Sequence, residues 1–294
     1  MNQTNLRDGE LAQVMGVLNV TPDSFSDGGT YESVKQARLH GELMMTQGAQ
    51  VIDVGGESTR PGAQPVDPAE EQRRVLPVIE ALADLLPDES VRISIDTRNA
   101  STARAAVAAG ATLINDVSAT LWPTAAELGV GWVAMHMQGD PRTMQKTPVY
   151  EDVVADVRKF LVDRAQRAVA AGVSEIWIDP GIGFGKTTAH NLELLANLDQ
   201  LVAEGFPVLV GTSRKRFLGE MIARSDDAIG SLTGEGTALS LAAEIRVVPP
   251  DSRADGSLAT AMWAMIQGVR MVRVHEVEST IQATKILTGN ILIP

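Results

Sequence analysis

The stretch Gly48-Ala-Gln-Val-Ile-Asp-Val-Gly-Gly-Glu57 holds the pattern on which the fold prediction depends. Gly48 ends a helical stretch, where a left-handed C-terminal cap is expected. A short apolar run, Gln50–Gly55, follows it, and it is nearly continuous rather than alternating. Such a run is typical of a parallel strand that is covered on both faces. The stretch therefore predicts a helix end, a buried parallel strand and then a polar loop that begins near Glu57.

The same pattern recurs along the chain. Glycines at positions 110, 172, 205 and 268 also follow helical stretches and precede apolar runs. Eight strands are predicted in this way: Gln13–Val20, Gln50–Gly55, Arg92–Thr97, Thr112–Val117, Gly131–His136, Glu175–Asp179, Pro207–Thr212 and Arg270–His275. Eight βα units in 294 residues predict an α/β fold, a (β/α)8 TIM barrel in a single domain that spans residues 1–294. A doubly wound open sheet is the alternative, which periodicity alone does not reject.

Two segments carry further local signals. Asp67-Pro68-Ala69-Glu70 combines an N-cap acid, a proline at the first helical position and a capping-box glutamate. From about Ser225 to Asp255, acids, glycines and a Pro249-Pro250 pair are too frequent for one regular helix. We predict an irregular, peripheral insert there, in which Thr237–Arg246 forms a short amphipathic helix.

Composition excludes several classes of function. The chain has no cysteine, which excludes disulfides, thiolate metal sites and cysteine nucleophiles. A net charge of -12 argues against nucleic-acid binding, which needs a basic face. Residues 1–13 are polar and no run of about 18 apolar residues occurs, so we expect no membrane association and a cytoplasmic location. Any anionic ligand must therefore be bound by local basic residues.

Polar residues follow nearly every predicted strand. In a (β/α)8 barrel the loops after the strands form the active-site face, so these residues are the functional candidates. Along the chain they are Asn19, Glu57–Arg60, Asp96, Asn115 with Asp116, His136, Asp179, Ser213–Arg216 and Arg273 with His275. Asp and Asn also end strands and turns for purely structural reasons, but that explanation does not account for eight such positions in register.

These positions lie within longer motifs. The two longest are Gly16-Val-Leu-Asn-Val-Thr-Pro-Asp-Ser-Phe-Ser-Asp-Gly-Gly29 and Asp53-Val-Gly-Gly-Glu-Ser-Thr-Arg-Pro-Gly62. Others are Ser94-Ile-Asp-Thr97, Ile114-Asn-Asp-Val117, Asp179-Pro-Gly-Ile-Gly-Phe184, Gly211-Thr-Ser-Arg-Lys-Arg-Phe-Leu-Gly219 and Val272-Arg-Val-His275. In content and order, along almost the whole chain, they resemble the bacterial dihydropteroate synthases. The resemblance implies condensation of 6-hydroxymethyl-7,8-dihydropterin pyrophosphate with 4-aminobenzoate in folate biosynthesis, by a homodimer that is a sulfonamide target.

The resemblance also implies roles for particular residues. Asp96, Asn115 and Asp179 are expected to hold the donor edge of the pterin, while Lys215 donates to its acceptor side. Met135 is expected to line the pocket and Phe184 to pack near the aminobenzoate, although ordinary core packing explains both equally well. Arg216, next to Lys215, is expected either to contact the anion or to lie at the surface.

Pyrophosphate is the second group that needs a site. Arg273 and His275 lie two apart on a predicted strand, so their side chains share one face. By resemblance, they and Asn19 cradle the pyrophosphate with Mg2+, and Asn19 is the expected metal ligand. An ion pair of Arg273 with Glu276 or Glu278 is the structural alternative. Many family members have Asp after this histidine, where this chain has Glu276, so no role is assigned to that acid.

Two mobile loops complete the expected site. By resemblance, Phe25 and Asp27 on the first and Thr59, Arg60 and Pro61 on the second close over the aminobenzoate. Lys215, Asp96, Arg273, His275, Asp27 and Arg60 are the expected catalytic residues. Two rival functions share the pterin residues: a methyltransferase that moves a methyl group from a folate to a corrinoid, and a relative that binds pterin without turnover. Arg273, His275 and the Ser213-Arg214-Lys215 motif disfavour the first, and the presence of lysine, arginine and loop motifs disfavours the second.

Overall fold

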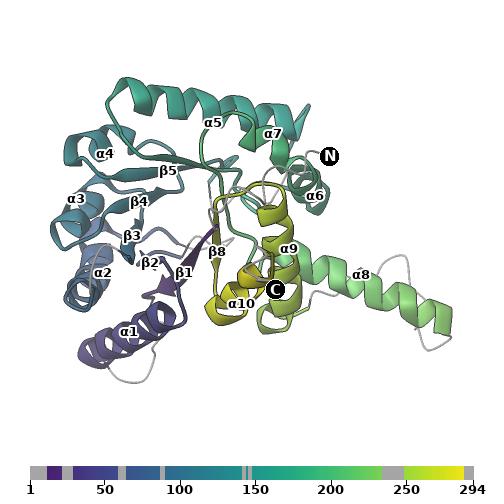
Figure 1. Cartoon of the computed structure of the whole chain (residues 1–294), viewed down its shortest axis with the longest axis horizontal. Coiled ribbons are helices and arrows are strands. Elements are labelled where there is room, and N and C mark those ends of the chain that lie inside the picture. Colours follow the sequence, from purple (N-terminus) through teal and green to yellow (C-terminus); the bar gives the residue numbers. More distant parts are fainter. Residues whose placement is uncertain are drawn as a thin grey trace, which may run out of the picture.

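The computed structural model confirms the predicted (β/α)8 barrel. It describes residues 12–21, 29–58, 64–86, 90–140, 144, 148–233 and 248–287. Within these residues the parallel strands are β1 (Gln13–Asn19), β2 (Val51–Gly55), β3 (Arg92–Asp96), β4 (Leu113–Asp116), β5 (Gly131–Met135), β6 (Ile176–Asp179), β7 (Leu209–Val210) and β8 (Met271–Val274). Each lies inside its predicted range, and helices surround them (Figure 1).

Strand order shows that the sheet curls into a barrel rather than remaining open. The hydrogen-bonded order is β6-β5-β4-β3-β2-β1-β8-β7, so the first and last strands of the chain are neighbours. The remaining seam, between β6 and β7, is joined by a parallel bridge between Ile178 and Val208. There the Ile178 amide donates to the Pro207 carbonyl at 3.0 Å. The doubly wound open sheet is therefore excluded.

The helices follow the strands in the order that the sequence predicts. They are α1 (Gly29–Thr46), α2 (Pro68–Ala83), α3 (Ala100–Ala108), α4 (Trp122–Leu128), α5 (Val153–Ala170), α6 (Thr188–Ala196), α7 (Leu198–Val202), α8 (Arg216–Thr233), the short 3-10 helix η2 (Pro250–Arg253), α9 (Ala254–Ile266) and α10 (Val277–Leu287). The five glycines predicted to end helices all have positive φ, with values of 102°, 119°, 89°, 83° and 94° for positions 48, 110, 172, 205 and 268. Their left-handed conformation confirms the predicted C-terminal caps.

The predicted start of α2 is correct in part. Asp67 is the N-cap, and its side chain accepts from the Ala69 amide at 2.9 Å. Glu70 does not act as the expected capping-box partner. It instead pairs with Arg73 and Arg74, at 2.6 and 2.8 Å, because residues three and four apart lie on one helix face.

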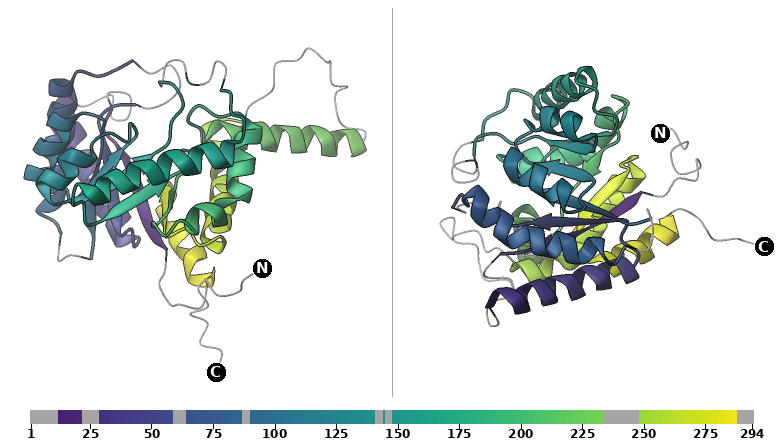
Figure 2. Two further views of the ribbon diagram at one scale, coloured as in Figure 1. Left: turned by 90° about the horizontal axis from the view of Figure 1, so that it is seen from above. Right: turned by 90° about the vertical axis from the view of Figure 1, so that its left-hand side faces the viewer.

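The segment predicted as irregular from Ser225 begins as regular helix. α8 continues to Thr233 and extends away from the barrel (Figures 1 and 2). The prediction was wrong here because one glycine within an exposed helix costs only about 1 kcal/mol, which does not end the helix. The helix predicted over Thr237–Arg246 lies outside the described residues, and the single-domain organisation with a peripheral insert stays a prediction. Within the described residues, no helix is both long enough and apolar enough to cross a membrane.

Side chains fill the barrel in two kinds of layer. Outside the strands, apolar residues such as Ile52, Ile93 and Ile114 pack against the helices. Inside, a separate apolar cluster takes one residue from each of seven strands: Met15, Val51, Leu113, Val133, Trp177, Leu209 and Met271. Because strand side chains alternate between faces, the residues two positions further along also point into the barrel. That second interior layer lies toward the carboxyl ends of the strands, and it combines four polar residues with Val17, Met135 and Gly211.

Candidate active site

The residues of the second interior layer lie two positions after those of the apolar layer on each strand. Four of the seven positions reached in this way are polar: Asp53 on β2, Asn115 on β4, Asp179 on β6 and Arg273 on β8. Asp96 on β3 joins them because it lies in register with Gly55 and Asn115. All of these except Arg273 are buried. The fold thus gathers carboxylates, an amide and a guanidinium at the carboxyl-terminal mouth of the barrel, where four of the five were predicted to act.

Arg273 is held by two carboxylates of this layer. Its Nε lies 2.6 Å from Asp53 Oδ2, and its Nη2 lies 2.9 Å from Asp96 Oδ2. The alternative prediction, an ion pair with Glu276 or Glu278, is wrong, because Arg273 points into the barrel like Met271 two positions before it, whereas those acids follow the end of β8. Burial lowers the pKa of Arg273, but the two carboxylates outweigh it and raise the pKa above its usual value. The side chain remains 23% exposed, so the guanidinium reaches the mouth.

Asp53 is the residue of this layer that sequence reasoning missed. It is fully buried, and its Oδ2 accepts from Arg273 and also from Asn115 Nδ2, at 2.9 Å. Among the described residues, its Oδ1 has no hydrogen-bond partner. The signal was present in the sequence, because an aspartate in the middle of the apolar run from Val51 to Val54 needs a buried partner.

Asp96 has an unusual protonation equilibrium. Burial raises the pKa of this carboxyl, Arg273 opposes the rise, and Asp53, Glu71 and Glu57 add to it, which places the pKa at about 7. A carboxylic acid normally titrates near pH 4. Asp96 therefore changes charge near neutral pH, where a ligand that donates to it would favour the carboxylate.

Lys215 and Asp179 face each other across the site. Burial lowers the pKa of Lys215 to about 8, while Asp179 opposes the fall. The ammonium donates to the Ile182 carbonyl and lies 4.6 Å from the centre of the Phe184 ring. Burial raises the pKa of Asp179, although Lys215 opposes the rise, and Asp179 also accepts from the Gly181 amide at 2.7 Å. Phe184 thus borders Lys215 instead of serving the core alone.

A buried lysine that sequence reasoning missed holds the loop between β6 and α6. Lys186 Nζ lies 3.0 Å from His136 Nδ1 and within 3.0 Å of the carbonyl oxygens of Gly181 and Phe184. Burial lowers the pKa of Lys186 to about 7, and burial next to this ammonium lowers the pKa of His136 to about 3. His136 is therefore a neutral acceptor. Nothing in the sequence around Gly185-Lys186 indicates this role, which depends on how the loop folds back on β5.

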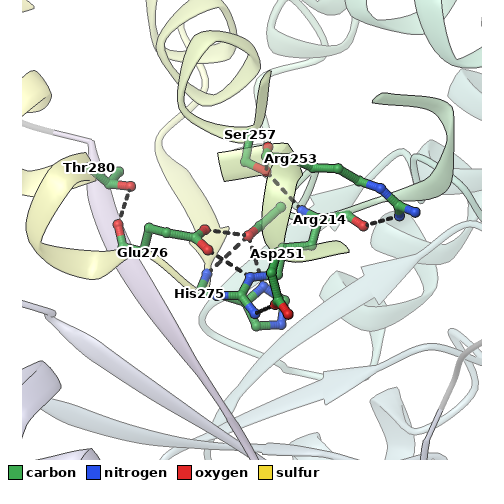
Figure 3. Close-up of polar contacts among 8 residues, drawn as sticks. Arg214, Asp251, Arg253, Ser257, His275, Glu276 and Thr280 are labelled. Atoms are coloured by element: carbon green, nitrogen blue, oxygen red, sulfur yellow. Dashed lines mark hydrogen bonds and ion pairs between the residues drawn. The ribbon is translucent and has the colours of Figure 1, made fainter. Parts of the chain in front are cut away.

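A second polar cluster lies beside the mouth, where the loops after β7 and β8 meet (Figure 3). Ser213 Oγ lies 2.8 Å from His275 Nδ1 and 3.1 Å from Glu276 Oε2. Arg214 Nε donates to Glu276 Oε1 at 2.7 Å, and its Nη1 pairs with the exposed Asp251 at 3.0 Å. Glu276, to which no role was assigned from the sequence, is therefore a central member of this cluster.

The structure describes only some of the remaining predicted site residues. Asn19 ends β1 and is half-buried, in register with Gly55, and Met135 is buried at the end of β5. Arg216 is exposed and pairs with Glu220 at 2.9 Å. Of the two roles expected for it, this is the one at the surface. Five residues lie outside the described residues, and their predicted roles stay predictions: Phe25, Asp27, Thr59, Arg60 and Pro61.

Comparison with known proteins identifies the class to which this barrel and its polar interior belong. A family model described as pterin binding enzyme matches residues 15–275, and the chain belongs to that family. The dihydropteroate synthase of Escherichia coli (strain K12) is 41% identical over 284 residues, covering 95% of this chain and 91% of that protein. The resemblance to dihydropteroate synthases is thereby confirmed.

Solved structures agree with this relationship. The dihydropteroate synthase of Xanthomonas albilineans with 4-aminobenzoic acid superposes with a TM-score of 0.80 and 42% identity, covering 97% of this chain and 95% of that one. The Xanthomonas albilineans enzyme in complex with 7,8-dihydropteroate gives a TM-score of 0.76 and 40% identity, covering 97% and 96%. The similarity thus extends over the whole barrel and not over one motif.

Proposed function

We propose that this protein condenses 6-hydroxymethyl-7,8-dihydropterin pyrophosphate with 4-aminobenzoate, giving 7,8-dihydropteroate and pyrophosphate. Family membership supports a pterin as substrate, and the named relatives are dihydropteroate synthases. The observation that carries the proposal is a barrel mouth with acceptors on one side and donors on the other. Asp96, Asn115 and Asp179 come from β3, β4 and β6, while Lys215 and Arg273 come from the loop after β7 and from β8.

This arrangement suits the edges of a pterin. The ring presents donors at its 2-amino group and N3, and acceptors at O4 and N5. Carboxylates accept and an ammonium donates, so Asp96 and Asp179 serve the first edge and Lys215 the second. Both aspartates are buried, and an unpaired buried carboxylate is costly, so a ligand that lacks these donors would be rejected.

The chemistry requires charge stabilisation rather than a strong base. The aryl amine attacks the pterin methylene carbon, a C–N bond forms, the C–O bond to pyrophosphate breaks, and the amine nitrogen releases one proton to solvent. Arg273 and His275 are then positioned to stabilise the departing anion, because arginine offers planar N–H donors that match phosphate oxygens. Asp96 as a carboxylate stabilises the positive character that develops on the pterin. Lys215 as an ammonium keeps the ring in register.

Magnesium is proposed as the cofactor, with Asn19 as its protein ligand. Mg2+ usually keeps several waters and is bound through few protein oxygens together with substrate phosphates. The half-buried amide of Asn19 fits such a site, and no group of three or more His, Asp or Glu residues within the described part of the chain could hold a metal by itself. When bound, Mg2+ would neutralise charge on the pyrophosphate. We also propose a homodimer in the cytoplasm, and this proposal rests on the relationship to the dihydropteroate synthases.

Pyrophosphate release tests the proposal. The full-length protein, Mg2+, pterin pyrophosphate and 4-aminobenzoate are mixed, and pyrophosphate is measured with and without the amine. Lys215→Ala should lose most of the rate, whereas Lys159→Ala, which removes the same charge from an exposed position on α5, should not. Release that does not need the amine would indicate a hydrolase, and binding without release would indicate a non-catalytic relative.

A further inference from the structure

The hydroxyl of Ser213 contacts three polar groups at the end of β8. Its Oγ accepts from the His275 backbone amide at 3.1 Å. It also lies 2.8 Å from His275 Nδ1 and 3.1 Å from Glu276 Oε2. Figure 3 labels His275 and Glu276 and marks the polar contacts of this cluster with dashed lines. Ser213 itself is largely buried, with 9% of its surface exposed.

Counting protons in this cluster fixes the tautomer of the imidazole. A hydroxyl has one hydrogen to donate and two lone pairs to accept with. The backbone amide can only donate, and a carboxylate can only accept, so the single hydroxyl hydrogen goes to Glu276. Ser213 therefore accepts from Nδ1, which must carry a hydrogen. In the opposite assignment, the hydroxyl would donate its hydrogen to Nδ1. Lone pairs of Ser213 Oγ and Glu276 Oε2 would then face each other at 3.1 Å.

Glu276 is fixed in its role by a second partner. Its Oε1 accepts from Arg214 Nε at 2.7 Å, so both carboxylate oxygens are used as acceptors. Arg214 is held in turn, because its amide donates to Ser257 Oγ at 2.9 Å and its carbonyl accepts from Arg253 at 2.8 Å. Arg214 also has a φ of 58°, a conformation that a non-glycine residue keeps only when its surroundings impose it.

We propose that Ser213 and Glu276 are positioning residues that hold His275 as its Nδ1–H tautomer, so that Nε2 is the ring nitrogen that contacts the pyrophosphate. The identity of that anion rests on the proposed function, while the tautomer does not. A neutral Nε2 has a lone pair, and an ionised phosphate oxygen has only lone pairs. One proton must therefore lie between them, either carried on Nε2 as imidazolium or brought by the pyrophosphate itself. As the C–O bond breaks, that proton lies in the hydrogen bond between Nε2 and the leaving group and stabilises its developing charge.

The tautomer can be observed directly. The chain has four histidines, so protein with 15N-labelled histidine gives few signals, and His275→Gln assigns those of His275. At a pH where the imidazole is neutral, we expect a protonated Nδ1 and an unprotonated Nε2. Glu276→Gln should shift the population toward Nε2–H, because an amide can donate to Ser213 and leave the hydroxyl hydrogen for Nδ1. A wild-type protein with Nε2–H would overturn the proposal.

Binding of pyrophosphate with Mg2+ supplies the functional readout. Ser213→Ala should weaken the affinity about tenfold, the value of one ordinary hydrogen bond. Ser213→Thr keeps the hydroxyl and should restore most of the affinity. In a His275→Gln background, Ser213→Ala should have almost no further effect, because Ser213 acts through the imidazole. An undiminished loss in that background would show a merely structural role. Failure of the protein to release pyrophosphate from the pterin substrate would refute the proposed function without altering the tautomer.

Discussion

Asp53→Asn is the substitution that most directly tests how the polar interior works. It keeps the shape of the side chain and removes its charge. Asp53 is fully buried beneath the mouth, where its Oδ2 accepts from both Arg273 and Asn115. The substitution therefore leaves Arg273 with Asp96 as its remaining carboxylate partner among the described residues.

The expected loss in free energy of unfolding depends on the contacts that Arg273 keeps after the substitution. Removing one partner from a buried ion pair costs about 3–5 kcal/mol. Here Asp96 still pairs with the guanidinium, and the new amide oxygen can still accept from Nε, so we expect a loss of about 2–3 kcal/mol. For a chain of 294 residues, the entropy of unfolding is about 0.6 kcal/mol/K, so that loss lowers Tm by roughly 3–5 °C. Because Arg273 and Asn115 are displaced, kcat/KM for the pterin pyrophosphate should fall by about tenfold, roughly 1.4 kcal/mol.

The substitution should also shift a pH profile. Burial is the main cause of the raised pKa of Asp96, and repulsion from Asp53 adds to it. Asp53→Asn removes that repulsion, so the rising limb of kcat/KM should move below the wild-type position near pH 7. Ser94→Ala is the matched control, because Ser94 is buried in register with Asp53 and its Oγ has no partner among the described residues. Equal effects of the two substitutions, or an unmoved limb, would refute this account of the polar layer.

Three further predictions follow from the same geometry. In the wild type, kcat/KM should rise as Asp96 ionises near pH 7 and fall as Lys215 loses its proton near pH 8, so a profile flat from pH 6 to 9 would contradict both assignments. Lys186→Met removes the donor for the Gly181 and Phe184 carbonyls. We expect about 3 kcal/mol of destabilisation in denaturant titration and a raised KM for 4-aminobenzoate. An unchanged KM would show that this loop does not contribute to aminobenzoate binding. Gly181→Ala would overlap the His136 carbonyl and should prevent normal folding of the loop, whereas Gly172→Ala, which meets no atom within 4 Å, should cost about 1 kcal/mol in the same titration.

Most of the barrel could be predicted from the sequence because each layer leaves a periodic trace. Parallel strands covered on both faces give continuous apolar runs, and the glycine caps mark where helices end. The least accurate prediction was Pro207–Thr212, of which only Leu209–Val210 is strand. Here Thr212 and Ser213 already belong to the loop, since their side chains bond to Thr260 and to the cluster around His275. Side-chain hydrogen bonds of this kind are invisible to periodicity.

The partners within the site could not be predicted in the same way. Asp53 and Arg273 are 220 positions apart, and their contact depends on β1 joining β2 to β8. The sequence offered only Glu276 and Glu278 as counter-ions for Arg273, and it gave no means of pairing that residue with Asp53, which lies in the middle of an apolar run. Glu276 reaches Arg214 because that residue adopts a left-handed conformation, for which the sequence shows no glycine or asparagine signal.

The pairing of charges explains how an acidic protein can bind an anionic substrate. Arg273 pairs with Asp53 and Asp96, and the charge of Lys215 interacts with that of Asp179. Neighbouring carboxylates therefore offset the positive charge of both residues. A pterin that donates to Asp96 and Asp179 would engage the carboxylates that now neutralise these cations. The positive charges of Arg273 and Lys215 would then be less offset and would attract the pyrophosphate of the same substrate molecule more strongly. Pyrophosphate alone leaves the carboxylates in place and must compete with them, so the two halves of the substrate support each other's binding at this mouth.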